Sequence, residues 1–442
     1  MRWILFLSAG AAIACAQGTL PLSLKRAVEI ALTPEGSPRV ALAEESIRQS
    51  QTGVAQARAA FLPDIETSLS DQNETVNLRT FGLNFQTLIP AGFGLNFPTT
   101  VGPFSVFDAR ATAQQNVFDF STIRKYQSSK ATVEATKADA ETTRNQVSDS
   151  VARAYLAALR ADTKLETERA NVDLSDALLK LAEREKTAGT GLAIEVTRAQ
   201  VQLANDKQNL IVAENDRRRS ILQLLRGMGL NLDARIEFTD KLAYKPVDVG
   251  PIEAALEKAR KERAELKAQA KREEIARLNY GSVKAERLPS VSAFGNYGTT
   301  GPAIDSASPT RDVGITLKVP IFDGGRRDAR RAESLSELRQ EQIKTRDIKQ
   351  QVELDVRLAL DSIRSAASQV DTAREGLSLA ENELAQARRR YEGGVANSVE
   401  VTDAQTRLDR ARDNQIAALY NYNLARLDLA TATGSISEYI NQ

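Results

Sequence analysis

A seven-residue repeat of apolar side chains runs through residues 356–391. Large residues recur at every seventh position, and alanines recur at every seventh position between them. The large residues are Val356, Ile363, Val370, Leu377, Leu384 and Tyr391, and the alanines are Ala359, Ala366, Ala373, Ala380 and Ala387. Apolar spacings of three and four residues are typical of a helix that packs along one stripe against another helix.

The segment after Gly393 and Gly394 carries the same kind of repeat. Its larger positions are Val401, Leu408, Gln415, Tyr422 and Leu429, and they alternate with Ala404, Ala411, Ala418, Ala425 and Ala432. Two such stripes joined by a short glycine turn predict an antiparallel helical hairpin, in which the alanine layers let the two backbones approach closely. A long coiled coil with no further role would satisfy the same pattern.

The sequence also indicates an internal duplication. The segment 195–200 (EVTRAQ) matches 400–405 (EVTDAQ), and the same shift aligns Gly229 with Gly434. Further upstream, Leu62-Pro63 corresponds to Leu288-Pro289. Matching segments in the same order and at the same spacing predict two copies of one structural unit.

We therefore expect a first repeat at 17–230, a linker at 231–250 and a second repeat at 251–442. Each repeat begins with a helix of about 35 residues, starting near Leu22 or Pro251, and ends in a long helical hairpin, over 121–226 or 324–433. Proline is absent between Pro103 and Pro246 and after Pro320, so nothing interrupts these helices. A single helix over 121–188 would be about 100 Å long.

Short segments with an alternating pattern separate the helices of each repeat. In 312–320, Val313, Ile315, Leu317 and Val319 alternate with smaller or polar residues, and weaker alternation occurs near 64–73, 104–117 and 290–298. A period of two predicts strands with one apolar face. No further segment is available to cover that face with a core. We therefore expect it to meet lipid, as in outer-membrane barrels, whose strands need about nine to eleven residues to cross.

The number of strands implies a homo-oligomer. A closed barrel needs at least about eight strands, and open sheet edges are not stable in hydrocarbon. Four predicted strands in one chain cannot close a barrel, so several chains would have to share one.

Composition limits the possible functions further. The net charge of +1 gives no electrostatic reason to expect nucleic acid as a partner. Histidine, the commonest general base and metal ligand, is absent from the chain. We therefore expect no enzyme activity and no catalytic, cofactor-binding or metal-binding residues.

The first residues are typical of an exported protein. Met1 and Arg2 precede an apolar run over 3–14, which predicts a secretory signal peptide over 1–16. Ala14-Cys15-Ala16 fits a cleavage site before Gln17, and cleavage there would leave a mature chain without cysteine. Alternatively, Cys15 is a lipidated first residue, although the preceding Ala12-Ile13-Ala14 lacks the usual leucine. In both interpretations the protein leaves the cytoplasm.

Several segments together resemble the TolC-like outer membrane efflux protein family. They are Arg-Tyr-Glu-Gly-Gly-Val at 390–395, Glu-Val-Thr-Asp-Ala-Gln-Thr-Arg-Leu at 400–408, Leu62-Pro63, Leu288-Pro289 and Ile-Phe-Asp-Gly-Gly at 321–325. The resemblance covers essentially the whole mature chain. It implies a mainly α fold with a membrane β-barrel contribution, in which the four strands of each chain of a homotrimer form a twelve-stranded barrel that continues into an α-helical tunnel.

The same resemblance implies a function. The protein would be the outer membrane channel of a tripartite efflux system, a passive exit duct for small molecules in a Gram-negative-type bacterium. Its partners would be outer membrane lipid, a periplasmic adaptor (membrane fusion) protein and an inner-membrane efflux pump. Two alternatives remain open from the sequence: a duct for type I protein secretion, and an exported structural coiled-coil protein without a membrane span.

Candidate site residues follow from the family's periplasmic constriction, which carries acidic residues just beyond the second helical tip. Glu400 and Asp403 match those positions, and three copies would form carboxylate rings that favour cations. The alternative is an ordinary solvated helix face. In the family a basic residue near this tip pairs with an acid on the first hairpin. Glu195 matches the acid, but Ala396 occupies the basic position, and Arg198 and Arg390 are the candidate substitutes.

The two glycine turns are the regions that an adaptor would contact in this family. They comprise Gly189, Thr190 and Gly191 at the first tip and Gly393, Gly394 and Val395 at the second. Independently of any partner, glycines at such positions permit the positive φ angles of a tight turn.

Overall fold

The computed structural model describes residues 19–33, 35–82, 98–189, 191–247 and 249–441. The predicted signal peptide with Cys15, and Thr190 at the first tip, lie outside the described residues. Two compact units are present. One is drawn from Met1–Ser46, Lys137–Ala268 and Arg346–Gln442, and the other from Ile47–Thr136 and Gln269–Thr345. Several long helices contribute residues to both units.

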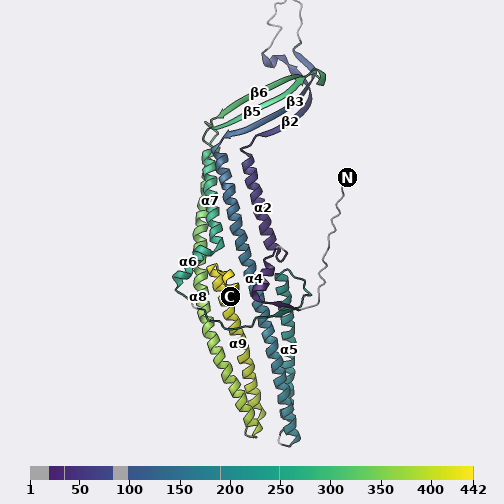
Figure 1. Cartoon of the computed structure of the whole chain (residues 1–442), viewed down its shortest axis with the longest axis vertical. Coiled ribbons are helices and arrows are strands. Elements are labelled where there is room, and N and C mark those ends of the chain that lie inside the picture. Colours follow the sequence, from purple (N-terminus) through teal and green to yellow (C-terminus); the bar gives the residue numbers. More distant parts are fainter. Residues whose placement is uncertain (1–18, 34, 83–97, 190, 248, 442) are drawn as a thin grey trace, which may run out of the picture. The chain divides into compact units, whose positions relative to one another are not determined.

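A four-stranded antiparallel sheet belongs to the second of these units (Figure 1). Its strands are β2 (Asp64–Asn77), β3 (Thr100–Phe118), β5 (Ser290–Gly301) and β6 (Ser308–Lys318), in the order β2-β3-β5-β6. Strand β6 ends at Lys318, before Pro320, which cannot donate a hydrogen bond to a neighbouring strand. The alternating apolar residues Val313, Ile315 and Leu317 are 81%, 77% and 62% exposed, so nothing in the described chain covers this face.

Two long helical hairpins account for most of the remaining residues (Figure 1). In the first, α4 (Phe120–Thr187) is followed by α5 (Ala193–Gly227). In the second, α8 (Arg326–Glu392) is followed by α9 (Ser398–Thr433) and the short α10 (Ile436–Ile440). Gly189 and Gly394 have φ angles of 80° and 69° at the two turns, which explains the glycines there. Asn397 begins α9 by accepting hydrogen bonds from the backbone N–H groups of Val399 and Glu400.

The buried face of the second hairpin follows the predicted seven-residue stripe. On α8 the buried members are Val356, Ala359, Ile363, Ala366, Val370, Ala380, Leu384, Ala387 and Tyr391, and on α9 they are Val401, Ala404, Leu408, Ala418, Tyr422, Ala425 and Ala432. Leu174, Leu178 and Leu181 of α4 pack against the end of this stripe nearest the turn. The alanine layers thus lie in close contact with apolar neighbours.

Because the stripe is closely packed, enlarging one alanine in it should destabilise the fold. Ala387→Leu, at a position only 3% exposed, is expected to lower the free energy of unfolding by about 1–3 kcal/mol. Ala385→Leu is the matched control, because Ala385 is exposed on the same turn of α8 and should change stability by no more than about 0.5 kcal/mol. Urea unfolding of both variants measures the difference, and equal stabilities would mean that Ala387 does not lie in a packed seam.

The prediction of one helix of about 35 residues at the start of each repeat is wrong. The first repeat has α1 (Leu24–Ala31) and α2 (Pro38–Ala59), and the second has α6 (Ile252–Glu262) and α7 (Ala264–Ala285). Gly36 lies between α1 and α2, where a Cβ atom would meet the Ile30 carbonyl oxygen at 2.1 Å. Arg263 separates α6 from α7 in an extended conformation, and its guanidinium pairs with Asp355 at 2.9 Å.

The region predicted as a linker contains a short strand. Strand β4 (Ile236–Phe238) pairs in parallel with β1 (Leu20–Leu22). Beneath this pair lies an apolar core formed by buried residues of α1, α4 and α5 and by Leu22, Val40, Met228 and Ile236. No helix among the residues that the structure describes is long and apolar enough to span a membrane.

Candidate functional site: the hairpin tips and the contact between the hairpins

The tip of the second hairpin holds an exposed ion pair. Arg390 Nε, at the end of α8, lies 2.9 Å from Glu400 Oε1, in the first turn of α9, and both side chains are about half exposed. Asp403 is exposed one turn further along α9. An exposed ion pair of this kind contributes little to stability. Glu400 and Asp403 therefore lie together on an accessible face of α9, with Arg390 beside Glu400.

Glu195, the acid predicted to pair with a basic residue near the second tip, contacts backbone groups within this chain. Its side chain is buried, and Oε2 accepts a hydrogen bond from the backbone N–H of Leu192 at 3.0 Å, which caps the start of α5. Its other oxygen lies 3.5 Å from the backbone nitrogen of Ser398, the first residue of α9. Glu195 thus links the two tips through backbone groups. Arg390 binds Glu400 instead, and Arg198 is exposed on α5.

Tyr391 lies close to this link. It is 7% exposed, and burial raises the pKa of its hydroxyl above the ordinary value. The carboxylates of Glu185 and Glu195 raise this pKa further, because they disfavour a phenolate beside them. Tyr391 therefore remains neutral and can only act here as a buried hydroxyl between the two tips.

The turns themselves present apolar side chains to solvent. Val395 is 69% exposed at the second tip and Leu192 is 66% exposed at the first. Ile194 and Val399 are also exposed nearby. Sequence reasoning named the glycines and Val395 but missed Leu192, Ile194 and Val399. The sequence did contain a signal for them: they are large apolar residues directly beside glycine turns, where no neighbouring helix can cover them.

A buried polar layer joins α4, α5 and α9 about two to four turns from the tips. Ser175, Asp206 and Gln405 are each no more than 2% exposed. Gln405 Nε2 donates to Ser175 Oγ at 2.5 Å, Ser175 Oγ donates to Asp206, and Gln202 Nε2 donates to Asp206 at 3.1 Å. Sequence analysis missed this layer. The signal was on α4, where alanine recurs at seven-residue spacing at Ala154, Ala161 and Ala182, but Glu168 and Ser175 occupy the two positions between Ala161 and Ala182.

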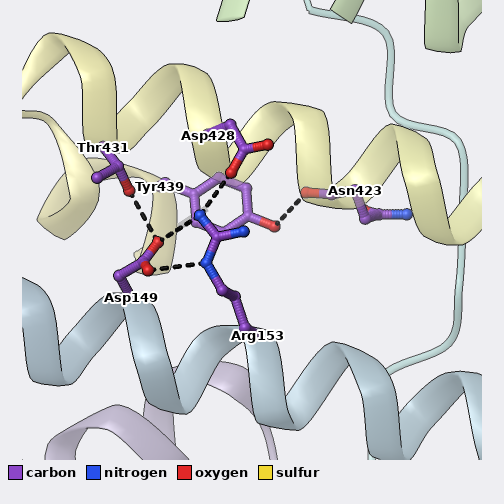
Figure 2. A network of polar contacts seen from close by, with 6 residues as sticks. All are labelled: Asp149, Arg153, Asn423, Asp428, Thr431 and Tyr439. Atoms are coloured by element: carbon purple, nitrogen blue, oxygen red, sulfur yellow. Dashed lines mark hydrogen bonds and ion pairs between the residues drawn. The ribbon is translucent and has the colours of Figure 1, made fainter. Parts of the chain in front are cut away.

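A second polar contact between α4 and α9 is drawn in Figure 2. Arg153 Nε donates to Asp149 at 2.8 Å, and its Nη2 donates to Asp428 of α9 at 2.5 Å. Thr431 of α9 donates to the same Asp149 carboxylate at 3.0 Å, while Tyr439 of α10 lies 3.4 Å from the Asn423 carbonyl oxygen. One arginine thus bridges carboxylates of two helices that are distant in sequence. Polar contacts therefore join the two hairpins at several levels.

The side chains of these contacts do not form a metal centre. Among the described residues, no three of Cys, Asp, Glu or His are grouped so that they could hold a metal ion. What the arrangement provides is a pair of accessible tips, a row of acidic groups on α9 and a polar interface between two helical rods.

Comparisons with known proteins agree on one family. Residues 30–230 and 255–435 match the family described as outer membrane efflux protein. Similar curated proteins include outer membrane protein TolC of Vibrio cholerae, 26% identical over 297 residues (65% of this chain and 67% of the relative), and pyoverdine export outer membrane protein OpmQ of Pseudomonas aeruginosa, 25% identical over 390 residues (86% and 78%). The Campylobacter jejuni CmeC outer membrane channel shares the fold, with a TM-score of 0.79 at 16% identity over 95% of this chain and 88% of that chain.

Proposed function

Since this chain belongs to the outer membrane efflux protein family, we propose that it is the passive exit duct of a tripartite efflux assembly, carrying small molecules across the periplasm and the outer membrane. Such a duct would make and break no bond, which is in line with a family of outer membrane channel proteins. An inner-membrane pump would supply the energy and the selectivity, and a periplasmic adaptor would connect the pump to the tips of this protein.

The observation that carries the proposal is the four-stranded sheet. Its edge strands β2 and β6 each have one side without a partner strand in the described chain, and the apolar residues of β6 are exposed. In hydrocarbon both features would be unfavourable unless the sheet closes on itself. Three copies, each joining β6 to the β2 of the next, would give a closed barrel of twelve strands with no free edge.

A membrane assembly test separates this proposal from a structural coiled-coil protein. The full-length protein is expected to fractionate with outer membranes and to migrate as a trimer that dissociates on heating. Ile315→Arg should reduce the trimer strongly, because an arginine on a lipid-facing position costs about 2–4 kcal/mol near the membrane centre. Thr316→Arg, on the other face of the same strand, is the matched control and should assemble normally.

The contrary result would be equally informative. A monomer that remains in aqueous buffer without detergent would rule out the duct and leave the exported coiled-coil protein. Equal assembly of both arginine variants would mean that the exposed face of β6 does not meet lipid.

The proposed site residues act at the periplasmic end. Three copies of Glu400 and Asp403 would surround the mouth with carboxylates and favour cations over anions. Glu195, through the Ser398 backbone, would hold the hairpins together in the closed state. The exposed apolar residues beside Gly191 and Gly394 would provide the surface for the adaptor, because a cluster of exposed large apolar side chains marks a site of interaction with another protein.

A further inference from the structure

Asp409 lies beside the polar layer of Ser175, Asp206 and Gln405, and one of its carboxylate oxygens is buried without a hydrogen-bond partner in the described part of the chain. It lies on α9, one turn beyond Gln405, and its Oδ1 atom is buried without a donor among the described residues. A buried polar atom that is left unsatisfied is unfavourable, and a charged one more so. The position of Asp409 therefore makes the contact between the hairpins sensitive to its charge.

The charged groups around Asp409 come from three helices. Glu168 and Lys164 lie on α4, Asp206 lies on α5, and Arg412 and Asp413 lie on α9. Lys164 is already paired with Glu168 at 2.5 Å and with Asp413, and Arg412 donates to Asn171 Oδ1 at 2.5 Å. Both cations thus have other partners, so the negative charges near Asp409 are only partly balanced.

These surroundings raise the pKa of Asp409 from its ordinary value of 3.8 to about 6. Burial is the largest cause, and Asp206, Glu168 and Asp413 add to it, while Arg412 opposes them. The pKa of Asp206 is raised as well, again mainly by burial, although its hydrogen bonds from Ser175 and Gln202 act in the other direction. Both carboxyl groups therefore take up protons more readily here than in water.

A cavity gives this layer contact with solvent protons. It has a volume of about 710 Å³ and lies between α4, α5 and α9. Its charged wall residues are Arg160, Lys164, Glu168, Asp216, Arg219, Asp409 and Asp413. Water in this cavity could exchange protons with Asp409 without separation of the hairpins.

We propose that Asp409 and Asp206, beside the carboxylate of Glu168, form a proton-dependent joint between the two helical hairpins, which packs tightly when Asp409 or Asp206 takes up a proton and loosens when they release it. The packed state binds a proton more strongly than the separated state does. Packing is therefore most stable below the ordinary carboxyl pKa and weakens as the pH rises to about 6. The joint lies within one chain, so this inference does not depend on the proposed duct function.

The direct test is the distance between the hairpin tips in the full-length protein. Spin labels at Thr187→Cys and Glu392→Cys, both exposed positions, with Cys15→Ser to remove the native cysteine, report this distance by double electron–electron resonance. The distance distribution should be short and narrow at about pH 5 and longer or broader at about pH 7.5. With Asp409→Asn added, the acidic form should be seen at both pH values. Asp371→Asn, an exposed change on α8, should retain the full response.

Two outcomes would overturn the proposal: identical distributions at both pH values in the parent protein, or an unchanged response in Asp409→Asn. If Asp409→Asn does not fold, Asp409→Ser tests the same prediction, because serine is also uncharged and is smaller. Thermal unfolding gives an independent measurement. Relative to the parent, Asp409→Asn should gain about tenfold in the folded-to-unfolded ratio between about pH 5 and about pH 7.5, because at pH 5 a carboxyl with a pKa of about 6 is mostly protonated in the packed state while an ordinary carboxyl is not.

Discussion

Replacing Tyr155 by alanine should lower the free energy of unfolding by about 3–5 kcal/mol. Tyr155 is 1% exposed in the core below strand β1, and its ring packs edge-to-face on Phe238 at 5.5 Å. Its hydroxyl donates to Asp240 Oδ2 at 2.7 Å and lies 3.0 Å from the Leu22 carbonyl oxygen. Alanine would leave a cavity and remove the side chain that joins α4 to both β1 and the residues after β4.

Tyr155→Phe is the matched control for this prediction. It retains the ring and removes only the hydroxyl, and Asp240 keeps its hydrogen bond from the Leu24 backbone N–H at 2.8 Å. The expected loss is therefore only about 1–2 kcal/mol. Urea unfolding of the two variants separates packing from hydrogen bonding. Equal losses would assign the whole effect to the hydroxyl and contradict the packing argument.

Much of the helical architecture could be predicted from local sequence because its determinants are local. The alanine layers and large layers recur at fixed spacing, and the burial of Val356, Ile363, Ala404 and Tyr422 follows from that spacing alone. Glycine turns end the helices where the stripe stops. The mainly helical fold and the outer membrane channel family were both within reach of this reasoning.

The features that sequence reasoning missed depend on contacts between distant residues. The break at Gly36 has a local signal, because Pro34 and Pro38 flank it. The close approach of the Gly36 carbonyl oxygen to Gly229, where a Cβ atom would lie 2.0 Å away, has none. Strand β1 forms only because Leu20 meets Ile236, and three residues are too few for a periodic signal. No local pattern encodes either approach.

The sequence predicted where the candidate site residues lie along the hairpins, but not which groups their side chains bind. The match of Glu195 to Glu400 placed both residues at equivalent points of the two hairpins. The side-chain oxygens of Glu195, however, bind backbone N–H groups, which every residue carries and which the sequence therefore cannot reveal. For the same reason the pairing of Arg390 with Glu400 within one hairpin needed the structure.

Removing the acidic groups at the second tip should change the ion preference of the proposed channel severalfold. Glu400→Gln combined with Asp403→Asn keeps the size of both side chains and removes six negative charges from a trimer. Carboxylate rings concentrate cations in a narrow mouth and repel anions, so the double variant should show a lower cation-to-anion permeability ratio in planar bilayers. Asp361→Asn, a 78% exposed change on α8, is the matched control and should leave the ratio unaltered.

A third variant separates charge from the loss of the ion pair. Arg390→Gln breaks the 2.9 Å contact with Glu400 but leaves all the carboxylates in place, so it should preserve or increase cation preference. If Arg390→Gln instead reproduced the double variant, the ion pair would set the width of the mouth and the carboxylates would have no selective role. An unchanged permeability ratio in the double variant would remove Glu400 and Asp403 from the proposed constriction, because rings of fixed charge at a narrow mouth cannot be neutralised without altering the ions that pass it.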